Sequence, residues 1–366
     1  VTTKQGKAGK IQISYDGNIG WQNVYKMVKP LTAKEYMIAE DMMRFNQGLQ
    51  PFDWSQYIDA DLLAAYQSGE NPGTNWLERL RNKNAITTNH AVNIAGGSDN
   101  STFSIGAGFQ DQDGTFGSPA PSNYRRFTFR VNSEHVVLRG KDKREVLKVG
   151  ENIYYQHAQT KGIQIGNQYS NNISTALRAN PLIPVFNSNG DYFSYNDFKA
   201  SGTSPTGWFS YNQYSSNPEY LLTMTQGANN KSRNMNLNAV GYVEISPWKG
   251  FKYRGQIDYK SYASSWKGMT KAYKINDSSD GQQASTSLTQ NETLGWNWGT
   301  THTFNYVFDV SKHHFDALFG MEYSREGNNM GDYMQATATG FMFDPNGLDY
   351  AYLRNFTDRS KATVDG

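Results

Sequence analysis

Apolar and polar residues alternate with a period of two in several segments of the chain. Between residues 10 and 21 the apolar side chains all occupy odd positions: Ile11, Ile13, Tyr15, Ile19 and Trp21. Successive side chains of a β-strand point to opposite faces, so this pattern predicts a strand with one apolar and one polar face. The alternation recurs in eight later segments, 88–95, 101–110, 124–133, 145–157, 231–245, 251–262, 291–309 and 313–325. The sequence therefore predicts an all-β protein with nine strands.

The lengths of the connections favour a membrane barrel, although alternation alone fits a soluble sandwich equally well. The connections cover 22–87, 96–100, 111–123, 134–144, 158–230, 246–250, 263–290 and 310–312, with a tail from 326. Every second connection is longer than its neighbours, so an up-and-down meander would place all tight turns at one rim. Outer-membrane barrels have this asymmetry, with short periplasmic turns and long extracellular loops. A sandwich has no reason to sort its loops, although two insertions on one side could imitate the pattern.

The long connections contain signals for short helices. Thr32-Ala-Lys-Glu35 is a capping box that predicts a helix to about Arg44. Asp59 is expected to cap a second helix that Gly69 stops, and Thr74 a third that runs through Arg81. A fourth helix is predicted from Asn171 to Ala179, since the following Asn180-Pro181 disfavours helical backbone.

A comparison of free energies indicates which strand face meets lipid. Turning the polar face of residues 251–260 outward would expose Arg254, and a basic side chain near the bilayer midplane costs about 2–4 kcal/mol. Turning the other face outward instead covers Phe251 and Ile257, which is favourable by roughly 1.5–3 kcal/mol per large side chain. The polar face is therefore predicted to line a wide barrel that is wet or plugged, because a small barrel must fill its own core.

Composition restricts the classes of protein. The longest apolar run covers only residues 62–66, whereas a membrane-spanning helix needs about 20 apolar residues. Aromatic residues make up 14% of the chain and its net charge is +2, which argues against disorder. The balance of 35 basic and 33 acidic residues argues against nucleic-acid binding. The low apolar fraction of 37% fits a barrel in which only every second strand residue meets lipid.

No catalytic motif is present in the sequence. Neither G-x-S-x-G nor H-E-x-x-H occurs, and the absence of cysteine excludes disulfides and thiolate metal sites. Asp111 and Asp113 could act as paired acids or cation ligands, but the following Gly114 favours a loop tip. We therefore expect no enzyme activity, no cofactor and no metal site.

A cluster of aromatic residues in the longest connection offers a candidate ligand site. The candidates are Trp208, Phe209, Tyr211 and Tyr214, which lie among Ser, Asn and Gly residues. Aromatic faces beside amides suit stacking on sugars or peptide groups. The alternative is that these side chains pack the loop against itself.

Short motifs also occur in a recognisable order. They include Asn75-Trp-Leu77, Asp111-Gln-Asp-Gly114, Leu147-Lys-Val-Gly-Glu-Asn-Ile153, Arg178-Ala-Asn-Pro-Leu-Ile-Pro184 and Pro247-Trp-Lys-Gly-Phe-Lys252. Each is weak alone, but their order and spacing from residue 1 to about 325 resemble the SusC/RagA-type TonB-linked outer-membrane transporters of Bacteroidetes. Residues 326–366 resemble the family only loosely.

This resemblance implies an antiparallel up-and-down transmembrane β-barrel, of which the chain would supply about nine of 22 strands. Residues 1–9 are expected to be the end of the plug and the linker into the barrel. Residues 10–366 are expected to be the N-terminal part of a truncated TonB-dependent-receptor barrel, with the plug and TonB-contacting segment missing. An isolated nine-stranded chain should not insert stably as a monomer, because its open edge leaves backbone groups unpaired in lipid.

The resemblance also implies a function in the outer membrane of a Gram-negative, Bacteroidetes-like cell. It implies TonB-dependent import of an oligosaccharide or peptide through a lipid-embedded barrel, with a SusD-like lipoprotein and the TonB complex as partners. The alternative from a different class is a soluble or surface-attached β-rich module that binds a ligand without transporting it. Extraction of the full-length protein from outer-membrane fractions, if it requires detergent, would favour the first.

Overall fold

Nine long strands form one antiparallel sheet in a computed structural model, which describes residues 8–163, 171–194, 197, 217–226, 230–274, 282–283 and 287–330. Each strand pairs with its neighbours in the sequence, in the order β1-β2-β3-β4-β5-β6-β7-β10-β11. The strands are β1 (Gly9–Gln22), β2 (Ala85–Gly97), β3 (Ser101–Asp113), β4 (Asn123–Arg139), β5 (Glu145–Lys161), β6 (Lys231–Ile245), β7 (Phe251–Thr270), β10 (Ser287–Val310) and β11 (His313–Met330). The nine predicted strands and their up-and-down order are confirmed.

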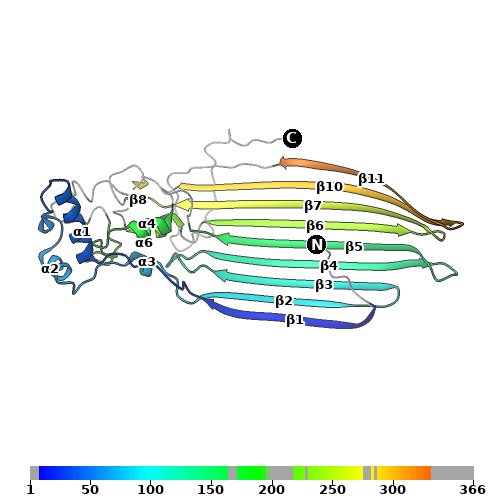
Figure 1. The fold of residues 1–366 in the computed structure, drawn as a ribbon, viewed down its shortest axis with the longest axis horizontal. Coiled ribbons are helices and arrows are strands. Elements are labelled where there is room, and N and C mark those ends of the chain that lie inside the picture. The colour runs from blue at the N-terminus through cyan, green and yellow to red at the C-terminus, as the bar shows by residue number, and fades with distance from the viewer. Residues whose placement is uncertain are drawn as a thin grey trace.

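The connections are sorted between the two ends of the sheet (Figure 1). The tight turns at 98–100, 140–144, 246–250 and 311–312 lie at one end. The longer connections, which contain all the described helices, leave the sheet at the other end, together with the small ladder of β8 (Tyr273–Lys274) and β9 (Gln282–Gln283). This arrangement confirms the prediction from connection lengths.

Several strands extend further into the loop end than the apolar alternation predicted. β7 continues to Thr270 and pairs there with Ser287 of β10. The added residues show no alternation of apolar and polar side chains, so sequence periodicity could not detect backbone pairing there. The sequence also predicted a loop tip at Asp111 and Asp113. This prediction is wrong, because both residues belong to β3.

The first two predicted helices are confirmed. In α1 (Ala33–Asn46), Thr32 and Glu35 form the expected capping box, in which the Thr32 amide donates to Glu35 Oε2 at 2.8 Å. The helix α2 (Ala60–Ser68) ends at Gly69, which adopts a left-handed φ of 85°. Asp59 occupies the N-cap position of α2, but its side chain makes no capping hydrogen bond.

The third helix differs from the prediction. The helix α3 covers only Trp76–Arg79, and its cap is Asn75, whose side chain accepts from the Glu78 amide. Thr74 instead donates its hydroxyl hydrogen to the carbonyl oxygen of Ile183 at 2.7 Å, which removes it from the helix end.

The other described helices are α4 (Asn172–Arg178), α6 (Pro218–Gln226) and the 3₁₀ turn η1 (Trp54–Gln56). The predicted fourth helix is present as α4, and the side chain of Asn171 caps it. In the part of the chain that the structure describes, no helix has the length and apolar character needed to cross a membrane.

One face of the sheet carries large, exposed apolar side chains from its first strand to its last. They include Ile11, Ile13, Val92, Phe127, Phe129, Ile257, Phe319 and Met321. A patch of this extent is unfavourable in water and marks a surface that meets lipid or another apolar partner. This supports the prediction from the sequence that the apolar face meets lipid and the polar face lines the barrel.

At two places on the described part of this apolar face, a tyrosine covers the glycine two residues further along its own strand. The Tyr253 ring lies over Gly255, and its hydroxyl group is 2.8 Å from Nδ1 of His302 on the neighbouring strand. Tyr15 lies over Gly17 in the same way, with its hydroxyl 2.7 Å from His90 Nδ1. Each pair satisfies two polar groups on a face that is mostly apolar.

Glu151 is a carboxylate at an apolar-face position of β5, between Val149 and Ile153. Its side chain accepts a hydrogen bond from the Ser133 hydroxyl, which also lies 2.7 Å from His135 Nε2. The carboxylate therefore has a hydrogen-bond donor on the neighbouring strand, which the sequence pattern alone did not reveal.

Candidate functional site

The two longest connections pack against each other beyond the loop end of the sheet. We call their described residues, 23–84, 171–194 and 217–226, the loop platform. One buried cluster consists of Trp76, Leu77, Leu80, Ala176, Ile183 and Leu222. The other consists of Ala33, Met37, Trp54, Ile58, Tyr66 and Leu182. Each cluster takes side chains from both connections, so burial of apolar surface joins the two loops.

The segment 180–183 accepts hydrogen bonds from the first connection. Trp76 Nε1 donates to the carbonyl oxygen of Asn180 at 2.9 Å, and the Thr74 amide donates to that of Pro181 at 2.8 Å. Asn180 and Ile183 are themselves buried. The motif Arg178-Ala-Asn-Pro-Leu-Ile-Pro184, which contributed to the family resemblance, thus supplies the segment on which the first connection docks.

An ion pair with two hydrogen bonds adds to this contact. Arg79 Nε lies 2.5 Å from Glu219 Oε2, and Arg79 Nη2 lies 3.1 Å from Oε1. The Glu219 side chain is 4% exposed, whereas that of Arg79 is 44% exposed. The hydrogen bonds that Arg79 donates to Glu219 raise the pKa of Arg79 above its usual value. The Tyr192 hydroxyl also donates to Glu219 Oε1, and burial raises the pKa of Tyr192.

The aromatic ligand candidates Trp208, Phe209, Tyr211 and Tyr214 lie outside the described residues, so their role stays a prediction. The nearest described residues on either side, Asp197 and Asn217, make hydrogen bonds with residues of the platform. Asp197 accepts a hydrogen bond from the Ser194 amide at 2.7 Å. Asn217 is buried, and its side-chain amide donates to the carbonyl oxygen of Val185 at 2.8 Å. The candidate segment therefore begins and ends at firmly held positions.

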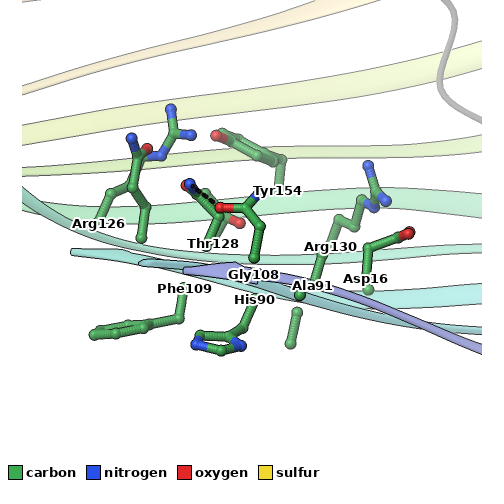
Figure 2. A pocket seen from close by; sticks show the side chains of 15 residues that line it. Asp16, His90, Ala91, Gly108, Phe109, Arg126, Thr128, Arg130 and Tyr154 are labelled. Atoms are coloured by element: carbon green, nitrogen blue, oxygen red, sulfur yellow. Dashed lines mark hydrogen bonds between the residues drawn. The ribbon is translucent and has the colours of Figure 1, made fainter. Parts of the chain in front are cut away.

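A second feature is a hollow on the polar face of the sheet, outside the loop platform. This hollow of about 390 Å³ is lined in part by Asp16, Asn89, Arg126, Thr128, Arg130 and Tyr154. Figure 2 shows Asp16, Arg126, Thr128, Arg130 and Tyr154 on one side of the sheet, with His90 and Phe109 on the other. The hollow has space over β3 because Gly106 and Gly108, which lie opposite Arg130 and Thr128, have no side chains.

The arginines of this hollow differ from Lys148, Lys252 and Arg254, three other cations of the polar face. Lys148 lies 3.2 Å from Glu134, and Lys252 and Arg254 both contact Glu244, at 2.9 and 2.7 Å. Within the described residues, neither Arg126 nor Arg130 makes an ion pair or a side-chain hydrogen bond. The hollow thus presents two guanidinium groups without local carboxylate partners.

The alternation in residues 124–133 predicts that Arg126 and Arg130 lie on the polar face, but it does not distinguish them from the other polar residues there. The signal was available in part, because both occupy even positions of an alternating segment. Their glycine neighbours come from another strand and depend on the register between β3 and β4. No pattern in the sequence indicated that Arg79 forms an ion pair with Glu219.

The described side chains include groups that can bind a ligand, among them the two guanidinium groups of the hollow. Among these residues, no group of three or more His, Cys, Asp or Glu side chains is placed to hold a metal ion. The platform provides a rigid support, and the hollow provides donors without a paired acid and base.

An antiparallel meander with one apolar face, one polar face and its long loops at one end has the architecture of part of an outer-membrane β-barrel wall. No protein-family model matches the chain. The chain is 24% identical to the TonB-dependent receptor SusC of Bacteroides thetaiotaomicron over 269 residues, which is 72% of this chain and 23% of SusC.

Solved structures show the same fold. A chain in the RagAB peptide transporter matches with a TM-score of 0.68 and 20% identity, over 99% of this chain and 39% of that chain. The RagAB peptide importer in its open-open state matches over the same shares, with a TM-score of 0.68 and 19% identity. The chain spans less than half the length of each of these relatives. Together the matches confirm the SusC/RagA-type resemblance and support the expected outer-membrane location.

Proposed function

We propose that the chain forms part of the wall and extracellular loops of an outer-membrane TonB-dependent importer of oligosaccharides or peptides. The observation that carries this proposal is a sheet with an exposed apolar face, a polar face and all large loops at one end. The similarity to the TonB-dependent receptor SusC supports the transport class. In this proposal residues 10–366 belong to the barrel, and residues 1–9 link it to a plug.

The proposed partners follow from this class. A SusD-like lipoprotein would cover the loop platform, and the TonB complex would act through a region that precedes the barrel. The packed interface between the two long connections would give such a lipoprotein a defined surface. The chain itself would have no enzymatic role, because import requires the binding and release of an unchanged nutrient.

The test uses the full-length protein in its native cells. We expect it to fractionate with the outer membrane and to need detergent for extraction. Recovery in the aqueous fraction without detergent would reject the importer and favour the β-rich binding module.

A second experiment tests the aromatic candidates for ligand contact. Substituting Trp208 and Tyr211 by Ala should weaken binding of the oligosaccharides or peptides that the wild-type protein binds by about tenfold, or ~1.4 kcal/mol. Tyr25→Ala serves as a control, since Tyr25 is a fully exposed aromatic residue of the other long connection. Unchanged affinity in a variant that still reaches the outer membrane would show that the cluster only packs the loop.

A further inference from the structure

We propose that the hollow at Arg126 and Arg130 binds an acidic oligomer that carries carboxylates on more than one unit. This inference rests on the proposed import function, because it concerns a ligand that enters the barrel from the loop end. It extends that function by naming the charge of the substrate.

The position of the hollow fits a ligand that has passed the loops. β4 begins at Asn123 at the loop end, so Arg126 and Arg130 lie about 10 and 24 Å along the strand from that end. Both side chains belong to the polar face, which faces the barrel interior if the apolar face meets lipid (Figure 2). A ligand that enters from the loop end would therefore reach Arg126 before Arg130.

The local charge favours an anion. A guanidinium group binds a carboxylate through two parallel hydrogen bonds, and such charge-assisted bonds are about twice as strong as neutral ones. Arg126 and Arg130 lack ion-pair partners among the described residues, in contrast to Arg254 and Lys148. The acid that lines the hollow, Asp16, is on β1, three strands and about 14 Å across the sheet from β4.

The spacing favours repeated carboxylates over a single one. The two arginines are four positions apart on β4, which places their Cα atoms about 14 Å apart on an extended strand. Arg130 lies across Gly106, where an added Cβ would be 2.5 Å from Arg130 Nε. Thr128 stands between the arginines, and Tyr154 lies opposite Arg130 on β5. These two side chains add a hydroxyl group and an aromatic face for the part of the ligand between its carboxylates.

Arginine-specific labelling of the full-length protein in detergent tests the proposal directly. Phenylglyoxal adducts at Arg126 and Arg130 are measured by peptide mass spectrometry with tetragalacturonate, tetraglutamate, maltotetraose or tetraglutamine present. We expect both arginines to react without an oligomer and to be protected by an acidic oligomer, but not by its neutral counterpart. Protection by the sugar acid or by the acidic peptide identifies the source of the carboxylates.

The variant arm measures affinity for the protecting oligomer. Arg126→Gln and Arg130→Gln should each weaken binding about tenfold, as expected for loss of one charge-assisted contact. Arg125→Gln is the matched control, because Arg125 is adjacent on the same strand but on the opposite face, where it pairs with Asp111. This control should bind like the wild type.

Three results would overturn the proposal. In the first, Arg126 and Arg130 fail to react with phenylglyoxal when no oligomer is present. In the second, neither acidic oligomer protects them, and in the third, the neutral counterparts protect them equally well. Outer-membrane fractionation of the same samples reports separately on the proposed function. A protein that fractionates correctly but gives any of these results rejects the acidic-oligomer site alone.

Discussion

Arg79 and Glu219 are 140 residues apart in the sequence and form an ion pair with two hydrogen bonds in the loop platform. The pair joins the end of α3 to the start of α6, and therefore one long connection to the other. Because Glu219 is almost fully buried, its charge depends on Arg79 for compensation.

Arg79→Ala should therefore loosen the platform. Removal of one partner leaves a buried charge, which costs about 3 kcal/mol. Hydrogen exchange of the full-length protein should show a corresponding loss of protection in residues 171–194 and 217–226. Lys83→Ala is the matched control, since its ion pair with Glu78 is exposed and contributes only about 0–1 kcal/mol. Equal protection in the Arg79 and Lys83 variants would contradict the assigned role of the ion pair.

The capping box of α1 should make the start of this helix sensitive to acid. Hydrogen bonds from the backbone and side chain of Thr32 lower the pKa of Glu35. A carboxyl whose pKa is lowered by folding stabilises the folded state above its unfolded pKa, and this contribution is lost as pH falls through the folded pKa. Amide protection in α1, corrected for intrinsic exchange rates, should therefore decrease below the ordinary titration range of glutamate.

Glu35→Gln provides the control for this acid sensitivity. A glutamine oxygen still accepts the Thr32 amide hydrogen, but it does not titrate. The pH dependence should disappear in this variant. If it persists unchanged, another group is responsible for it.

The Tyr253 ring needs the space above Gly255. An added Cβ at residue 255 would lie 2.5 Å from the Tyr253 hydroxyl oxygen and would displace the ring from His302. Gly255→Ala should lose this hydrogen bond and cost about 1 kcal/mol. The temperature at which the full-length protein loses its compact band on semi-native gels should fall. Gly241→Ala should show no decrease, because its Cβ would meet only Ile257 at 3.8 Å.

Two neighbouring carboxylates test which face of the sheet meets lipid. Glu151 is on the apolar face, whereas Glu134 is on the polar face and contacts Lys148 and Tyr242. Glu151→Leu should change stability in phospholipid vesicles by less than about 1 kcal/mol, since it replaces a carboxylate on the lipid side by an apolar group. Glu134→Leu should be clearly destabilising, because it leaves Lys148 without one of its two carboxylate partners. The opposite order of stabilities would reverse the assignment of the faces.

The period-two pattern was sufficient to locate the nine strands. The connection lengths were sufficient to predict that the tight turns lie at one end of the sheet and the long loops at the other. Both signals are local, because strand alternation depends only on which side of the backbone each side chain points to. The capping box at Thr32 and Glu35 and the stop at Gly69 could be predicted for the same reason. Backbone pairing beyond the apolar alternation, as in β7 up to Thr270, left no signal in side-chain type.

The apolar and polar faces, the strand order and the class of barrel wall were thus determined by the sequence itself. Only the tertiary structure decided that Thr74 serves a loop contact while Asn75 caps α3, and that Arg79 meets Glu219. It also decided that glycines of β3 lie opposite Arg130 and Thr128, which opens the hollow on the polar face. These contacts join residues distant in sequence, so they follow from strand register and loop packing and not from any local pattern.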